Sequence, residues 1–173
     1  SKIGYLHDLG AEVLYFNPIF DAFSNHKYDG NDFMIIDPAY GTMQDLRSVS
    51  DAAHGSGMRV MLDTVFNHMG RRSPMFQEAL ANPQSPYRSW FKFTDKSPVG
   101  YTGWYDVANL PELRLEDPGV QDYLFAKPDS VIPRYIREGK VDGYRFDVAF
   151  NIGRQMMARM SGAAHAAGPD KIW

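Results

Sequence analysis

Continuous apolar runs mark three candidate strands in this chain. They are "EVLYFNPIF" at 12–20, "MRVMLDTVF" at 58–66 and "KVDGYRFDVAF" at 140–150. Runs of this kind are typical of strands that are buried on both faces of a parallel sheet. Pro18 is expected to end the first run, because proline cannot donate a hydrogen bond to a neighbouring strand. We expect a fourth strand to begin at "KIW", residues 171–173.

Segments with helical spacing of apolar residues separate these strands. They cover residues 1–10, 42–57, 117–139 and 152–168. Thr42 fits a helix N-cap, with Asp45 three residues later. Pro128 and Pro133 are expected to split or kink the helix predicted over 117–139. Strict alternation of helices and strands implies a parallel sheet with helical cover, a pattern that open sheets and barrels share.

Residues 69–116 interrupt the alternation. They are rich in Pro, Gly, Ser, Trp and Tyr and carry only short patterned pieces. A segment this long is usually functional or forms a small subdomain. The chain opens with an amphipathic helix, which differs from a signal peptide, and both of its ends look cut. We therefore expect a piece of a longer protein, whose location, cytoplasmic or secreted, stays open.

Composition excludes several classes of protein and site. The net charge of −3 gives no electrostatic case for binding nucleic acid or an anionic membrane. The absence of cysteine excludes disulfides and thiolate metal sites. No run is apolar enough to span a bilayer, and no glycine-rich phosphate-binding motif follows a strand. The remaining candidates for chemistry are polar residues at strand ends.

Polar side chains recur where the predicted strands end, and α/β architectures collect their functional residues at such ends. The candidates are Asn17 after the first strand, Asp63, Asn67 and His68 after the second, and Arg145 and Asp147 in the third. Arg145 and Asp147 lie two positions apart, so they share a strand face. A structural interpretation stays open for each: Arg145 and Asp147 as an ion pair, Asp63 as a loop cap, and the others as ordinary turn or loop residues.

Two stretches resemble conserved regions of one enzyme family. "DTVFNH" (63–68) is similar to the pattern D-x-V-x-N-H, and "GYRFDVA" (143–149) to G-x-R-x-D-x-A, of the α-amylase family of glycoside hydrolases. "LYFNPIF", "NHKYDGNDFMIIDPAYGT" and "LPELRLEDP" agree with the same family in the same order along the chain. "SNHKYDG" and "GWYDVANLPELRLEDP" look most like its branch of cyclomaltodextrinases, neopullulanases and maltogenic amylases.

The resemblance implies an α/β fold, namely a partial (β/α)8 TIM barrel that runs from the first helix to the start of the fifth strand, with a small domain inserted after the third strand. Residues 1–68 and 117–173 would belong to the barrel, and residues 69–116 to the inserted domain. A partial barrel leaves sheet edges uncovered, so we expect poor solubility from this chain by itself.

The resemblance also implies retaining cleavage or transfer at α-glucosidic bonds of an α-glucan oligosaccharide or a cyclodextrin, with no cofactor required. Asp147 matches the nucleophile, and Arg145 would orient it and favour its ionised form. The acid/base glutamate of the family would follow Trp173, because Glu112 and Glu138 lie in the wrong elements. We therefore expect the chain to be inactive alone.

Other positions match or neighbour the sugar-binding part of the family's site. They are Tyr28, Asp63, Phe66, His68, Trp104 and Tyr105. By this resemblance, Asp63 would mainly support Arg145. His68 would donate to sugar hydroxyls, and the ring of Tyr28 would stack on the sugar. Phe66, Trp104 and Tyr105 would lie near neighbouring sugars.

A calcium ion and a dimer are further expectations from the resemblance. Asn67 is a candidate calcium ligand, because many α-amylases use the asparagine of D-x-V-x-N-H. Two features weaken this expectation: Asn151 stands where those enzymes have histidine, and residues 69–116 lack a carboxylate-rich oxygen cage. The branch also suggests a homodimer of the full-length parent.

Two other interpretations stay open. One is a non-catalytic relative that acts as a carbohydrate-binding or transporter-associated partner, and the presence of Arg145 and Asp147 speaks against it. The other is an unrelated small-molecule-binding α/β domain, complete in itself. The unfinished strand at "KIW" speaks against that one.

Overall fold

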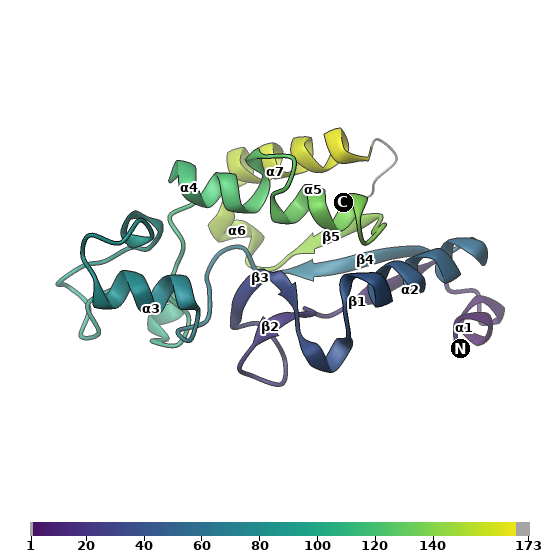
Figure 1. Ribbon diagram of the computed structural model, residues 1–173, viewed down its shortest axis with the longest axis horizontal. Helices are drawn as coiled ribbons and strands as arrows, with labels where there is room; N and C mark the ends of the chain where they lie inside the picture. The colour runs from purple at the N-terminus through teal and green to yellow at the C-terminus, as the bar shows by residue number, and fades with distance from the viewer. Residues whose placement is uncertain (1, 169–173) are drawn as a thin grey trace.

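The computed structural model in Figure 1 describes residues 2–168. Its central element is a parallel sheet of three strands in the order β1 (Val13–Phe16), β4 (Arg59–Thr64), β5 (Gly143–Phe146). The parallel sheet predicted from the sequence is thus confirmed for the described residues. The strand predicted at 171–173 lies outside them.

Each strand is shorter than the apolar run that predicts it, and the difference is largest for β5. The sequence predicts that the third strand extends to Phe150, but it ends at Phe146. Val148 adopts a left-handed backbone conformation with φ 55°, and the helix α6 (Ala149–Ile152) follows at once. An apolar run does not by itself show where a strand ends: Val148 is buried although it follows β5, and Phe150 is highly exposed.

Helices alternate with these strands along the chain. They are α1 (Ile3–Asp8), α2 (Met43–Gly55), α3 (Pro74–Ala81), α4 (Pro118–Gln121), α5 (Val131–Arg137), α6 and α7 (Arg154–Ala167), with the short turns η1 (Pro38–Tyr40), η2 (Arg88–Trp90), η3 (Trp104–Asp106) and η4 (Asp122–Ala126). In Figure 1, α5 and α7 lie side by side, and α2 runs along β4.

Local sequence signals set two of the helix boundaries. Thr42 and Asp45 form a capping box in which each side chain accepts a hydrogen bond from the other's backbone N–H, as predicted. The helix predicted over 117–139 is split at Pro128, which lies between η4 and α5. Pro133 does not break α5, because it occupies the first turn, where a backbone N–H has no partner inside the helix.

The two faces of the sheet differ in character. Leu62 of β4 points into the core and is fully buried, whereas Met61 and Asp63 point the other way. The register places Asp63 opposite Arg145 and Met61 opposite Tyr15, so Tyr15 and Arg145 share the face of Asp63. The prediction of burial on both faces is wrong for β1, whose residues are exposed or half-buried because β1 is an edge strand among the described residues.

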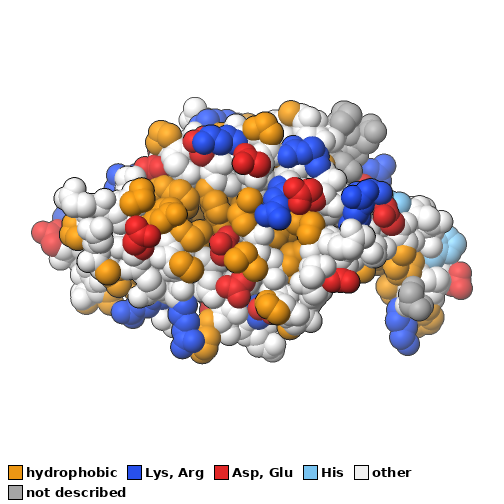
Figure 2. Space-filling view, viewed as in Figure 1, with side chains coloured by type: hydrophobic (Ala, Val, Ile, Leu, Met, Phe, Trp, Pro, Cys, Tyr) orange, Lys and Arg blue, Asp and Glu red, His pale blue; other side chains and the backbone are white. Residues whose placement is uncertain are grey.

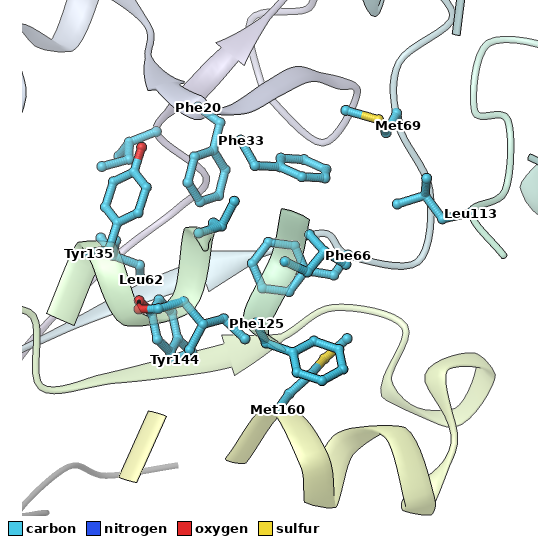
Figure 3. Close-up of a cluster of buried hydrophobic side chains, with 14 of the residues drawn as sticks. Phe20, Phe33, Leu62, Phe66, Met69, Leu113, Phe125, Tyr135, Tyr144 and Met160 are labelled. Carbon is cyan, nitrogen blue, oxygen red and sulfur yellow. Dashed lines mark hydrogen bonds between the residues drawn. The ribbon is translucent and has the colours of Figure 1, made fainter. Parts of the chain in front are cut away.

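An antiparallel hairpin that the sequence analysis did not predict packs against this sheet. It consists of β2 (Phe20–Ala22) and β3 (Gly30–Ile36). Phe20 and Phe33 meet edge to face at a centroid distance of 5.4 Å, and Phe33 meets Phe66 at 5.3 Å. Figure 3 shows these rings together with Tyr135 in the core, so aromatic packing attaches the hairpin to α5 and to the segment that follows β4.

The segment 69–116 lies beyond the carboxyl end of β4 (Figure 1) and is held by its own aromatic cluster. Phe76 of α3 packs edge to face on Phe91 at 4.9 Å and on Tyr101 at 4.8 Å. An isolated antiparallel bridge joins His68, which precedes the segment, to Glu112 near its end. Its status as an inserted domain with these boundaries remains a prediction.

Apolar side chains gather across the middle of the face seen in Figure 2, and positive and negative side chains are interspersed around them. In the part of the chain that the structure describes, none of the helices has the length and apolar character needed to cross a membrane.

Candidate active site

Arg145 joins two carboxylates at the carboxyl ends of β4 and β5. Its Nη1 lies 2.9 and 3.0 Å from the two carboxylate oxygens of Asp63 and 2.7 Å from Oδ1 of Asp147. The backbone N–H of Asp147 donates to the carbonyl of Thr64 at 2.8 Å, which fixes Asp147 next to β4. The ion pair that the sequence analysis considers for Arg145 and Asp147 is present. The shared strand face is not, because β5 ends at Phe146 and Asp147 follows it.

The charge on Arg145 is strongly favoured by this arrangement. Partial burial acts against the charged guanidinium, but the hydrogen bond to Asp63 and the charges of Asp63 and Asp147 outweigh it, so the pKa of Arg145 is raised. A permanently cationic side chain is thus shared between a fully buried carboxylate, Asp63, and a partly exposed one, Asp147.

Asp63 accepts hydrogen bonds from two phenols as well. The hydroxyls of Tyr15 and Tyr28 both donate to its Oδ2, Tyr28 at 2.7 Å. Burial, followed by the hydrogen bond to Asp63, raises the pKa of both phenols, so both remain donors. Asp63 therefore supports Arg145, as the sequence analysis expects, but its burial leaves no surface for a direct sugar contact.

Tyr15 is the site residue that the sequence analysis missed. It reaches Asp63 from a different strand, 48 positions earlier in the sequence. The run "EVLYFNPIF" shows only that Tyr15 lies in a strand. Its alignment with β4 depends on the register of the sheet, which the sequence does not display.

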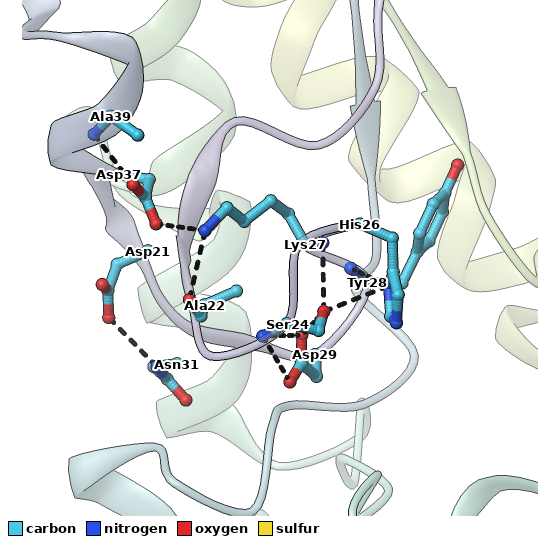
Figure 4. A network of polar contacts seen from close by, with 10 residues as sticks. All are labelled: Asp21, Ala22, Ser24, His26, Lys27, Tyr28, Asp29, Asn31, Asp37 and Ala39. Carbon is cyan, nitrogen blue, oxygen red and sulfur yellow. Dashed lines mark hydrogen bonds and ion pairs between the residues drawn. The ribbon is translucent and has the colours of Figure 1, made fainter.

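The loop between β2 and β3 holds Tyr28 in place through the polar network of Figure 4. Lys27 donates to Asp37 at 2.5 Å and to the carbonyl of Ala22 at 3.3 Å. The backbone N–H of Ser24 and its hydroxyl both donate to Asp29. Lys27 itself takes a positive φ of 66°, a conformation that persists only where surrounding contacts enforce it.

His68 is turned away from open solvent. Its Nε2 lies 3.1 Å from the carbonyl of Tyr28 and its Nδ1 lies 3.2 Å from Nδ2 of Asn67. A carbonyl only accepts, so Nε2 carries the hydrogen and Nδ1 accepts from the amide. Burial lowers the pKa of His68 and favours this neutral form. The sequence predicts that His68 donates to sugar hydroxyls. In this arrangement its Nε2–H instead donates to the carbonyl of Tyr28.

The three aromatic candidates have different environments. Phe66 is fully buried among Phe20, Phe33 and Phe146, so its predicted contact with a sugar is wrong. The chain turns after β4 ends at Thr64 and carries Phe66 into the core. Trp104 stacks on His68 with ring centroids 5.5 Å apart, and its neighbour Tyr105 is highly exposed, which leaves both as candidates for a sugar contact.

The donor set near Asn67 does not resemble a calcium site. The amide of Asn67 is directed at the ring of His68. Among residues 2–168, no group of three or more His, Asp or Glu side chains is placed to hold a metal ion. Calcium prefers six to eight oxygen ligands, so the calcium expectation gains no support from the described residues, and no chemical step is assigned to a metal.

Comparison with known proteins adds the family to this geometry. The family model described as "Alpha amylase, catalytic domain" matches residues 1–167. The chain belongs to the α-amylase family. This membership excludes the interpretation as an unrelated α/β domain. It also identifies the sheet and its helices as similar to part of the family's TIM barrel.

Individual α-amylase-family relatives agree with the branch suggested by the motifs. The chain is 39% identical over 182 residues to an intracellular maltogenic amylase of Bacillus subtilis. This alignment covers 100% of this chain and 30% of that protein. It is 35% identical over 180 residues to neopullulanase 2 of Thermoactinomyces vulgaris, covering 99% and 30%. A solved cyclomaltodextrinase structure matches with a TM-score of 0.89 at 35% identity, covering 99% of this chain and 30% of that one. The chain thus spans about a third of the length of these relatives.

Proposed function

We propose that this chain is part of a retaining glycoside hydrolase or transglycosylase that acts on α-glucosidic bonds of an α-glucan or a cyclodextrin. The observation that carries the proposal is the placement of Asp147 at the end of β5, partly exposed and held at 2.7 Å by Arg145. Family membership and the names of the relatives, which include maltogenic amylase and cyclomaltodextrinase, support the substrate class.

Asp147 is the proposed nucleophile. In a retaining reaction, a carboxylate oxygen of Asp147 attacks the anomeric carbon while the bond from that carbon to the leaving oxygen breaks, which gives a covalent glycosyl-enzyme. Water or another sugar hydroxyl then attacks the same carbon and releases Asp147. Arg145 fixes one oxygen of Asp147, so the other oxygen is free to react.

A second carboxyl group must protonate the leaving oxygen, and it lies about 5–5.5 Å from the nucleophile in retaining enzymes. Asp63 does not fit this role, because it is buried and accepts hydrogen bonds from Tyr15, Tyr28 and Arg145. Glu112 is paired with Lys92 at 2.6 Å. We therefore assign the acid/base role to none of the described residues.

A fluorinated sugar tests the nucleophile without relying on the acid/base group. In 5-fluoro-α-glucosyl fluoride, the fluoride ion departs without protonation, and the second fluorine slows both steps by destabilising the oxocarbenium-like transition state. We expect the natural protein to gain the mass of one fluoroglucosyl group, and peptide mapping to place that group on Asp147.

Two variants make the result specific. Asp147→Asn should not be labelled, whereas Asp51→Asn, which changes an exposed aspartate of α2, should be labelled like the natural protein. Labelling at another residue, or none at all, would refute the assignment of Asp147. Binding of maltooligosaccharides without labelling would instead favour a non-catalytic carbohydrate-binding protein.

A further inference from the structure

Tyr15 occupies a position that strand packing by itself does not explain. Its side chain lies on the face of the sheet that carries Asp63 and Arg145, and 47% of Tyr15 is exposed. Burial of the ring therefore accounts for only part of what Tyr15 contributes to the structure. Its hydroxyl donates to Oδ2 of Asp63, the same oxygen that accepts from Tyr28.

The contacts that Asp63 and Asp147 make with Arg145 are coupled through one nitrogen atom. Nη1 of Arg145 lies within 3.0 Å of both oxygens of Asp63 and 2.7 Å from Oδ1 of Asp147. Asp63 is fully buried, so its negative charge must be balanced by donors inside the protein. Each phenol that donates to Asp63 supplies part of the hydrogen bonding that Arg145 would otherwise have to provide.

We propose that Tyr15 is a positioning residue for the nucleophile: by donating to Asp63, it leaves Arg145 free to remain directed at Asp147. The catalytic consequence rests on the proposed function, whereas the structural consequence does not. Tyr28 supplies the second phenol from the loop between β2 and β3, so two separate elements hold the same carboxylate.

The structural arm of the test uses Tyr15→Phe in the natural protein. This change removes one oxygen atom and keeps the half-exposed ring. We expect a crystal structure of the variant to show Arg145 drawn toward Asp63 and no longer within hydrogen-bond distance of Asp147. Nitrogen NMR of the Arg145 guanidinium should show faster rotation and faster hydrogen exchange in the variant. An unchanged contact between Arg145 and Asp147, with unchanged exchange, would overturn the proposal.

The functional arm separates positioning from binding. We expect Tyr15→Phe to lower the rate constant for labelling by 5-fluoro-α-glucosyl fluoride by about tenfold, the size of one lost hydrogen bond to a charged group, with the affinity for the probe unchanged. Tyr5→Phe, which alters an exposed tyrosine of α1, is the matched control and should leave both constants unchanged. A variant with unchanged rate constant, or one with weaker affinity alone, would contradict the positioning role.

The two proposals fail in different ways. If the natural protein is not labelled at Asp147, the proposed function fails, and the NMR and crystallographic arm still decides the role of Tyr15. If the natural protein is labelled and Tyr15→Phe behaves like Tyr5→Phe, only the positioning role fails. The double variant Tyr15→Phe/Tyr28→Phe should show a larger loss of labelling rate than the product of the single losses, because Asp63 then keeps no phenol donor.

Discussion

The ion pair between Lys27 and Asp37 allows a sharp test of what burial contributes to stability. Nζ of Lys27 lies 2.5 Å from Oδ2 of Asp37, and the two side chains are only 12% and 11% exposed. Lys27 also donates to the carbonyl of Ala22 at 3.3 Å, and Asp37 accepts from the backbone N–H of Ala39 at 2.9 Å. Lys27→Met removes the charge but keeps most of the apolar stem.

We expect Lys27→Met to lower the free energy of unfolding by about 3 kcal/mol. Removing one partner of a buried pair typically costs about 3–5 kcal/mol, because the remaining charge stays buried without compensation. The low end applies here, since Asp37 keeps its hydrogen bond from Ala39. The measurement is urea unfolding of the natural protein and of Lys27→Met, monitored by tryptophan fluorescence.

A second lysine provides a matched control. Nζ of Lys140 also lies 2.5 Å from an aspartate oxygen, that of Asp51, but these side chains are 38% and 49% exposed. Exposed pairs contribute little, so Lys140→Met should leave the unfolding midpoint almost unchanged. Equal losses from Lys27→Met and Lys140→Met, or no loss from Lys27→Met, would refute the reasoning that burial sets the cost.

The pair also predicts an acid dependence. The hydrogen bond from Lys27, followed by the one from the backbone N–H of Ala39, lowers the pKa of Asp37 below its ordinary value of 3.8. A lowered folded-state pKa means that this stabilisation is present above pH 3.8 and is lost as the pH falls through the folded-state pKa. Lys27→Met should weaken this dependence in the same urea experiment.

Three further predictions concern the candidate site. Asp63→Asn replaces an acceptor of Tyr15, Tyr28 and Arg145 with a group that can no longer accept from all of them, so we expect a loss of roughly 3 kcal/mol in urea unfolding; a loss well below 1 kcal/mol would contradict the network. The raised pKa of the Tyr15 phenol means that its contribution to stability is complete below pH 10.0 and is lost progressively as the pH rises above that value. The melting temperature should therefore fall less between about pH 9 and 11 in Tyr15→Phe than in the natural protein. Parallel curves of melting temperature against pH would contradict this prediction. The lowered pKa of His68 makes its neutral form the stabilising one, so stability should decline as the pH falls below 6.5 and His68→Gln should reduce that decline, measured as the urea midpoint against pH.

The sequence by itself determined the strands of the parallel sheet, the helices between them and one charged pair. Continuous apolar runs located the three strands of the parallel sheet, helical spacing of apolar residues located the helices between them, and the box formed by Thr42 and Asp45 set the start of α2. The spacing of Arg145 and Asp147 was enough to suggest that they pair, and they meet at 2.7 Å although β5 ends before Asp147. These features are local, because the period of a helix or strand and the reach of a capping side chain involve only residues close together in the chain.

Only the tertiary structure decided which distant side chains meet. Tyr15 reaches Asp63 because of the register between β1 and β4, and Tyr28 reaches it because a loop pinned by polar contacts turns back over the sheet. Phe66 lies in the core, not in the site, because the chain turns after β4, where strand alternation no longer fixes its direction. Register and loop direction are set by packing and hydrogen bonds between residues far apart in the sequence, and a periodic pattern within one element carries no record of its partner.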